Sequence, residues 1–331
     1  PHTIRIILSG HSDQEAILRT VGITHQYLAK PCEPDVLKDV IRQSCSLHEV
    51  LNDGRLKNLL TDLTTLPSLP RLYMDVQEAL RNPDISLQEI GEMIEKDIAM
   101  SVKVLQLVNS AFFGLYQKVN SPVHAVKLLG LDTIKTLVLS LEIFTEFDND
   151  ATLFPIEQLW SHSLAVAHCA KLIAKEEDDD EQMLINCFNS GLLHDIGKLI
   201  LITEKKEEYK QVIENVEKRD MSLIESENNI LGATHSNIGA YLAGLWGFNR
   251  SIIEAICFHN RLQEYPSSNF NPAVALHVAN AFVSKTFPAP QLRTSLDVNI
   301  NYLSQIKLVD RLDKWSQVCD EYLDQSITSD S

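Results

Sequence analysis

The spacing of apolar residues changes once along this chain, near Leu56, and that change constrains the fold more than any other feature. Before it, strand-like runs at 3–10 and 25–31 alternate with amphipathic stretches, the pattern of a parallel α/β sheet. After it, the apolar residues follow helical spacing without strand alternation. The sequence therefore predicts a mainly α protein in which a partial α/β segment precedes an all-helical bundle.

Capping signals mark several helix boundaries in the second part. Ser86 with Glu89 forms a capping box, and Ser121 is expected to cap the next helix but one. A long apolar helix is expected between them, from Ile98 to Gly114. Near-helical spacing after 303 predicts a terminal helix, which the polar end of the chain would follow as a disordered tail.

Composition narrows the functional classes. Forty-five acidic residues against 29 basic ones give a net charge of −16, which repels phosphate backbones, so direct nucleic acid binding is not expected. No apolar run reaches the roughly 18 residues of a membrane span, so no membrane association is expected. Six widely separated cysteines without a CxxC pair are typical of reduced thiols in the cytoplasm.

The strand ends "ILSGHSD" and "YLAKP" resemble the second half of a response-regulator receiver domain. Ser9 and Lys30 match the hydroxyl and lysine positions that flank a phosphorylated aspartate in that family. The resemblance implies phosphorelay from a histidine kinase. The phosphoacceptor would lie before Pro1, which we interpret as the edge of a fragment, so no phosphate labelling is expected without the missing half. A generic α/β segment remains the alternative.

A long amphipathic helix is expected to follow the second strand. Over 35–51, apolar residues recur at close to heptad spacing, interrupted by Ser44. We expect this helix to link two modules and to contribute to a homodimer.

Two longer segments, "KDIAMSVKVLQLVNSAFFG" and "VNSPVHAVKLLGLDTIKTLVLS", are similar to the first half of the HDOD domain, an output module of bacterial signalling proteins. "GLLHDIGKLIL" and "GATHSNIGAYLAGLWGF" continue the resemblance. It implies an all-helical bundle from a family regarded as mostly non-catalytic. The expected domains are a partial receiver at 1–50, a linker at 51–65, an HDOD domain at 66–285, and a loop, helix and tail at 286–331.

Several side chains of this bundle are candidate metal ligands. A divalent cation favours imidazole and carboxylate ligands that converge from different helices. Related HD phosphohydrolases hold a metal with such a set, and their metal activates a water for attack on a phosphoryl group. The resemblance assigns the corresponding positions here to His162, His194, Asp195, His235, His259 and Asn280.

Two positions depart from the catalytic pattern. Asn280 replaces the aspartate that closes the metal site, and Asn260 replaces a second histidine of two-metal relatives. The set either holds a divalent metal or is a hydrogen-bonded remnant that fastens helices together. Because Asp195 is the one carboxylate identified, we predict weak or absent metal, no other cofactor and no turnover of cyclic dinucleotides. Lys198 is expected to snorkel or to pair with an acid.

Three functions follow from these features. The first is a response regulator of a two-component system, whose non-catalytic HDOD output domain binds an unknown protein or small-molecule partner. The alternative is a metal-dependent HD-type phosphohydrolase that acts on a nucleotide second messenger. A pure scaffold is the third.

Overall fold

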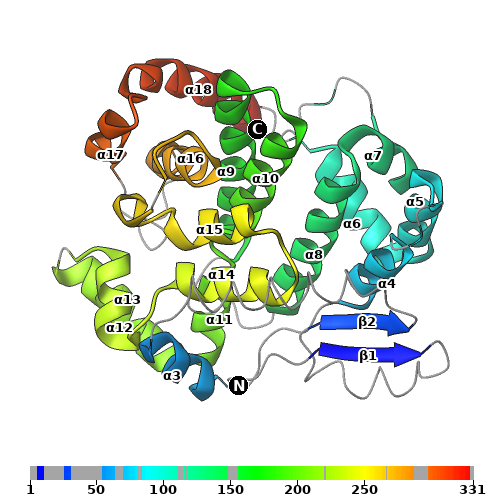
Figure 1. Cartoon of the computed structure of the whole chain (residues 1–331), viewed down its shortest axis with the longest axis horizontal. Helices are drawn as coiled ribbons and strands as arrows, with labels where there is room; N and C mark the ends of the chain where they lie inside the picture. The colour runs from blue at the N-terminus through cyan, green and yellow to red at the C-terminus, as the bar shows by residue number, and fades with distance from the viewer. Residues whose placement is uncertain are drawn as a thin grey trace.

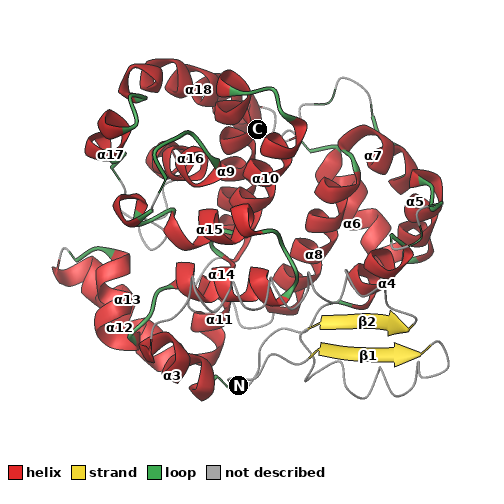
Figure 2. Ribbon diagram, in the orientation of Figure 1, coloured by secondary structure: helices red, strands yellow, loops and turns green. Residues whose placement is uncertain are grey.

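The computed structural model describes residues 6–10, 26–30, 54–63, 70–80, 82, 84–110, 113, 115, 118–147, 156–219, 221–265, 267–286 and 297–328. The predicted mainly helical fold is confirmed (Figure 2). The helices are α3 (Gly54–Asp62), α4 (Arg71–Ala79), α5 (Leu87–Lys96), α6 (Ile98–Val108), α7 (Pro122–Leu129), α8 (Leu131–Phe147), α9 (Ile156–Glu177), α10 (Glu181–Leu193), α11 (Ile196–Glu204), α12 (Lys206–Arg219), α13 (Leu223–Leu231), α14 (His235–Leu245), α15 (Arg250–Phe258), α16 (Pro272–Thr286), α17 (Ile300–Gln305) and α18 (Leu312–Thr328), with short 3-10 helices η4 (Leu262–Glu264) and η6 (Val309–Arg311). In the described part of the chain, no helix combines the length and apolarity of a membrane span.

Two strands, β1 (Ile6–Gly10) and β2 (Gln26–Lys30), lie where the first pattern predicts them. They pair in parallel, with Ser9 opposite Ala29 and Gly10 opposite Lys30. The helices expected at 12–22 and 35–51, and with them the linking and dimer contacts of the second one, fall outside the described residues.

The segment predicted to be a linker contains a helix that belongs to the body. Leu56, Leu59 and Leu60 of α3, with Leu63 directly after it, follow the i, i+3, i+4, i+7 spacing of one helix face and are all buried. They join a hydrophobic cluster with residues of α8, α11, α14 and α15. The linker boundary at 51–65 stays a prediction, and within it the apolar face of α3 is packed on the body.

Helices α4 to α8 form one side of the body (Figure 1). The capping box of Ser86 and Glu89 is present, and Ser121 caps α7 as predicted. Helix α6 ends earlier than the predicted Gly114, at Val108, and Asn109 is its C-cap. The Asn109 amide donates to the carbonyl oxygens of Leu105 and Val119 and accepts from the Val119 N–H. The bonds to Val119, ten residues away, take the place of the backbone hydrogen bonds that a further helical turn would make.

Helix α9 lies at the centre of the second half, where it packs against α10, α16 and α18 (Figure 1). It contributes buried side chains to each of the three hydrophobic clusters of the body, for example Leu159, Val166 and Leu164. Its position fixes the helices that surround the candidate site.

The single terminal helix predicted after 303 is instead three elements, α17, η6 and α18. Lys307 adopts a positive φ of 61°, which continuous helix does not allow, and the chain turns there. Helix α18 then extends through Thr328, so the first residues of the predicted disordered tail are helical. Arg311 and Trp315 both donate to the Glu177 carboxylate at the end of α9, which fastens α18 to the body.

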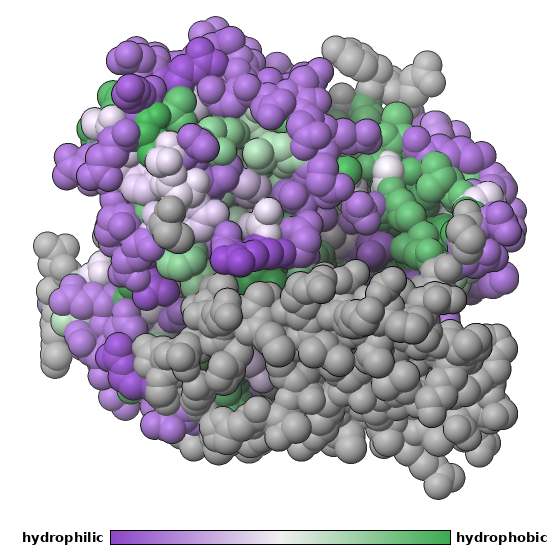
Figure 3. All heavy atoms as spheres, viewed as in Figure 1, coloured by the Kyte–Doolittle hydropathy of each residue, from purple (hydrophilic) through white to green (hydrophobic). Residues whose placement is uncertain are grey.

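Apolar side chains are exposed on the side formed by α5 to α7. Ile98 keeps 78% of its surface exposed, and Leu87, Val102 and Leu128 are also exposed. Figure 3 shows green apolar residues gathered on that side, whereas purple hydrophilic residues dominate the face over α17 and α18.

Candidate metal centre

The predicted site residues occupy helix ends and helix interiors around α9. His162 lies within α9, and His194 and Asp195 form the junction between α10 and α11. His235 is the first residue of α14, where Thr234 is the cap, and His259 directly follows α15. These junctions bring polar side chains together where helices end.

The structure brings all six predicted residues to one buried cluster. Ring centroids lie 5.5 Å apart for His162 and His194, 5.1 Å for His194 and His259, and 5.7 Å for His235 and His259. Asn280 on α16 closes the cluster, with its Oδ1 3.0 Å from His162 Nε2. Each of these side chains is at most 2% exposed.

A glycine permits the close approach of two of these helices. A Cβ at Gly197 in α11 would collide with the backbone carbonyl of His235 at the start of α14. The backbones therefore touch at this point. The "HDIGK" glycine consequently positions His235 next to the His194–Asp195 junction.

Backbone carbonyls orient two of the imidazoles. His194 Nδ1 lies 2.7 Å from the Gly191 oxygen, and His259 Nδ1 lies 2.7 Å from the Ile256 oxygen. A carbonyl oxygen only accepts, so Nδ1 carries the hydrogen in both rings and Nε2 presents a lone pair to the cluster. This is the tautomer that metal-binding histidines use.

A second carboxylate, Glu227, was missed in the sequence and corrects the expectation of a single acid. It is fully buried on α13, and its Oε2 lies 2.8 Å from His235 Nδ1 and 2.9 Å from the His235 backbone nitrogen. Tyr209 donates to its other oxygen, and burial followed by the Glu227 charge raises the tyrosine pKa well above its ordinary value. Glu227 thus orients His235 without facing the centre.

Lys198 pairs with an acid, the second of its two predicted possibilities. Its Nζ lies 2.7 Å from Asp195 Oδ2, and both side chains are 1% exposed. Burial opposes the Asp195 charge, but the surrounding His194, Lys198 and His235 side chains hold the pKa of Asp195 well below its ordinary value. The carboxylate of the cluster is therefore ionised and already has an internal cation.

Burial keeps most of the imidazoles in the uncharged form. It lowers the pKa of His162 to about 3, assisted by the nearby His194. It also lowers the pKa of His194, and that of His259 falls well below its ordinary value. Uncharged imidazoles are the form that binds a cation.

The donor set fits a divalent cation. Two groups offer ligand atoms within 4.8 Å of one another, His162–His194–Asp195 and Asp195–His235–His259. Among the described residues, His194 Nε2 and Asp195 Oδ1 have no hydrogen-bond partner although both are buried. Imidazole nitrogen with carboxylate oxygen suits zinc, manganese or iron. Lys198 and the asparagine amides compete for the same atoms.

Other residues fall outside this cluster. Ser9 and Lys30 lie at the ends of β1 and β2. His277 links the cluster to α17: its Nδ1 donates to the His259 oxygen and its Nε2 accepts from the Asn299 N–H. His168 lies among aromatic rings instead, 4.8 Å from Phe113.

Comparisons with known proteins agree on the helical body. The family model of the HDOD domain matches residues 66–262. An uncharacterized protein of Treponema pallidum (strain Nichols) is 27% identical over 213 residues, 63% of this chain and 40% of that protein. This chain therefore spans about two fifths of the length of that curated relative.

Solved structures share the fold. An HDOD domain protein of unknown function from Geobacter sulfurreducens has a TM-score of 0.65 at 24% identity, over 83% of this chain and 94% of that one. A candidate phosphohydrolase from Shewanella amazonensis SB2B has a TM-score of 0.63 at 24% identity, over 81% and 95%.

Proposed function

The chain belongs to the HDOD family, and we propose that it is the output part of a response regulator that acts by binding a partner rather than by catalysis. The partner is a protein or a small molecule. A histidine kinase would act on the receiver, and the pairing of two copies through the helix at 35–51 remains part of the proposal.

The pairing of Lys198 with Asp195 carries the non-catalytic assignment. A metal-dependent hydrolase needs the negative charge of its aspartate to compensate the metal, whereas here the Lys198 ammonium group, 2.7 Å away, already neutralises that carboxylate. Asn280 adds no charge where the catalytic relatives have an acid. The cluster can thus hold its helices together through side chains of the chain itself.

The parallel pairing of β1 and β2 supports the receiver part of the proposal. Ser9 is the penultimate residue of β1 and Lys30 the last residue of β2, so both lie toward the carboxyl edge of the sheet. In parallel α/β sheets this is the edge where ligands and reactive groups gather.

Elemental analysis and a hydrolysis assay on the purified chain test the non-catalytic part. We expect well under one divalent metal per chain and no cleavage of cyclic di-GMP with added Mn²⁺. Hydrolysis that disappears in both His194→Ala and Asp195→Ala would overturn the proposal.

The second candidate is a metal-dependent phosphohydrolase. The unpartnered His194 Nε2 and Asp195 Oδ1 favour it, since a cation between them would satisfy both. A bound metal would supply a polarised water, and His194, Asp195 and His162 would hold it. Asn280→Asp is the discriminating variant, because the added acid should raise metal affinity if the geometry is retained.

A further inference from the structure

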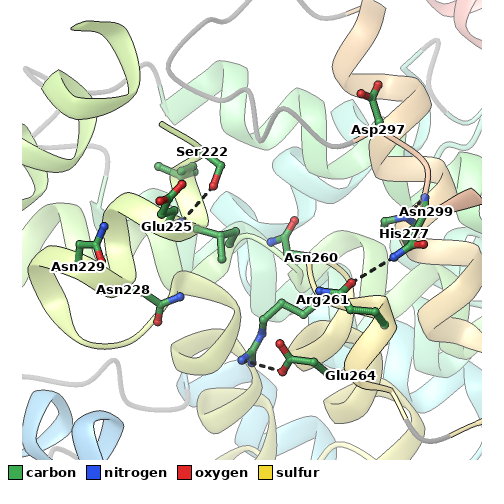
Figure 4. Close-up of a pocket in the computed structure, with 13 residues that line it drawn as sticks. Ser222, Glu225, Asn228, Asn229, Asn260, Arg261, Glu264, His277, Asp297 and Asn299 are labelled. Carbon is green, nitrogen blue, oxygen red and sulfur yellow. Dashed lines mark hydrogen bonds and ion pairs between the residues drawn. The ribbon is translucent and has the colours of Figure 1, made fainter. Parts of the chain in front are cut away.

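A cavity lies beside the histidine cluster. Its volume is about 620 Å³, within the range of small-molecule sites, and most of the residues that line it are of polar types. Figure 4 shows Asn260 between Glu225 on one wall and His277 on the other. Asn260 and His277 both contact His259, the first at its Nε2 and the second at its backbone oxygen. The cavity therefore meets the cluster at Asn260.

The hydrogen bonds of His259 determine which end of the Asn260 amide faces the cluster. His259 Nδ1 donates to the Ile256 oxygen, so Nε2 presents a lone pair and needs a donor. The NH2 group of Asn260 supplies it, with Nδ2 2.7 Å from His259 Nε2. The same Nδ2 lies 3.1 Å from His235 Nε2 and 2.9 Å from Ser236 Oγ.

These contacts cover two of the three ligand atoms in the Asp195–His235–His259 group. A cation bound there would need the Nε2 lone pairs of both histidines, which the amide NH2 group already occupies. The partial positive charge of the NH2 group would also repel the cation, so the two cannot bind at the same position. Metal binding to this group therefore requires that the Asn260 side chain leave, and the adjoining cavity is open space into which it can turn.

We propose that Asn260 controls metal access to the Asp195–His235–His259 group. Its amide occupies the Nε2 atoms of His235 and His259 and so prevents metal binding. A divalent cation binds once the amide has turned into the cavity. This rests on the proposed function, in which the side chains of the chain itself hold the cluster together. A cavity ligand that draws the amide away would open the group to metal.

Metal titration of the full chain tests this role. Co²⁺ is the probe, because its visible absorption reports imidazole coordination while calorimetry gives the dissociation constant. Asn260→Ala should bind Co²⁺ about tenfold more tightly than the unaltered chain, because a tenfold change corresponds to the free energy of one or two neutral hydrogen bonds. Asn228→Ala is the matched control, since Asn228 lines the same cavity and, among the described residues, makes no hydrogen bond to a histidine. It should leave the affinity unchanged.

Two further variants locate the effect. Adding His259→Ala to Asn260→Ala should remove the gain and the cobalt spectrum together. Asn260→Ser has a side chain too short to reach both imidazoles and should show the same gain in Co²⁺ affinity. It replaces the alanine variant if that variant does not fold. Unchanged Co²⁺ affinity in a folded Asn260 variant would overturn the role of Asn260 alone. Hydrolysis of cyclic di-GMP by the unaltered chain would overturn the proposed function instead.

Discussion

The backbone N–H and the ring Nδ1–H of His235 both point at one carboxylate, that of Glu227, at 2.9 and 2.8 Å. This bond fixes the ring so that Nε2 faces Asp195 at 3.3 Å and Asn260 at 3.1 Å. Glu227 is therefore the residue that aims His235 at the centre of the cluster.

Glu227→Gln should weaken metal binding at the cluster about tenfold or more, the usual effect of losing a carboxylate behind a ligating histidine. The amide cannot accept from His235 and Tyr209 with both of its ends. Co²⁺ titration in the Asn260→Ala background measures the change. Glu225→Gln, an exposed position on the same helix, should have no effect, and equal losses in the two variants would contradict the role of Glu227.

Lys198→Met should lower the free energy of unfolding by about 3–5 kcal/mol, because the buried Asp195 would lose its cation. Denaturant unfolding monitored by circular dichroism gives the value. Lys210→Met is the control, since Lys210 also lies 2.7 Å from an acid three residues away, Glu207, but on the surface. It should lose less than about 1 kcal/mol. A small loss in Lys198→Met would show that Asp195 is compensated in another way.

Gly197→Ala should destabilise the protein by about 3 kcal/mol, although alanine is the better helix former, because its Cβ would collide with the His235 backbone. Gly239→Ala should change stability by less than about 1 kcal/mol. Its Cβ would meet side-chain methyl groups of Ile256 and Ile196, at 3.2 and 3.5 Å, and the Gly197 backbone nitrogen at an ordinary contact distance of 3.6 Å. Thermal unfolding of the two variants makes the comparison, and a neutral Gly197→Ala would refute the backbone contact between α11 and α14.

His168 predicts a dependence of stability on pH. Burial, followed by the Lys171 charge, lowers its pKa to about 3, whereas an unfolded histidine titrates near 6.5. The unfolded chain therefore binds the proton first, so the stabilisation is present above about pH 6.5 and is lost as the pH falls toward 3. The loss is about 1.4 kcal/mol per pH unit for this group.

Substitution by phenylalanine isolates this contribution. His168→Phe retains a ring against Phe113 and Phe188 and should flatten the fall in unfolding free energy between pH 6 and 4. His124→Phe, at an exposed position of α7, should keep the full slope. An unchanged slope in His168→Phe would mean that the imidazole titrates normally in the folded protein.

Local signals predicted the features that depend on local contacts. Ser86 and Glu89 bond to each other across one helical turn, so their spacing alone indicates the helix start. The end of α6 was not predictable in this way, because Asn109 bonds to Val119 across a loop. The resemblance to known families located the histidines and Asp195. Glu227 was missed because a glutamate in a short amphipathic helix has the pattern of a solvent-facing residue, and only the packing of α13 on α12 and the bonds to His235 bury it.

Helix α9 belongs to all three hydrophobic clusters at once, through side chains such as Leu159, Val166 and Leu164. A force or a ligand that rotates α9 would therefore disturb both halves of the bundle and would move His162 with them. The same helix ends at Glu177, which Arg311 and Trp315 of the C-terminal region hold. The helix consequently joins the histidine cluster, through His162, to the C-terminal region, through Glu177, so a displacement of one would be felt at the other.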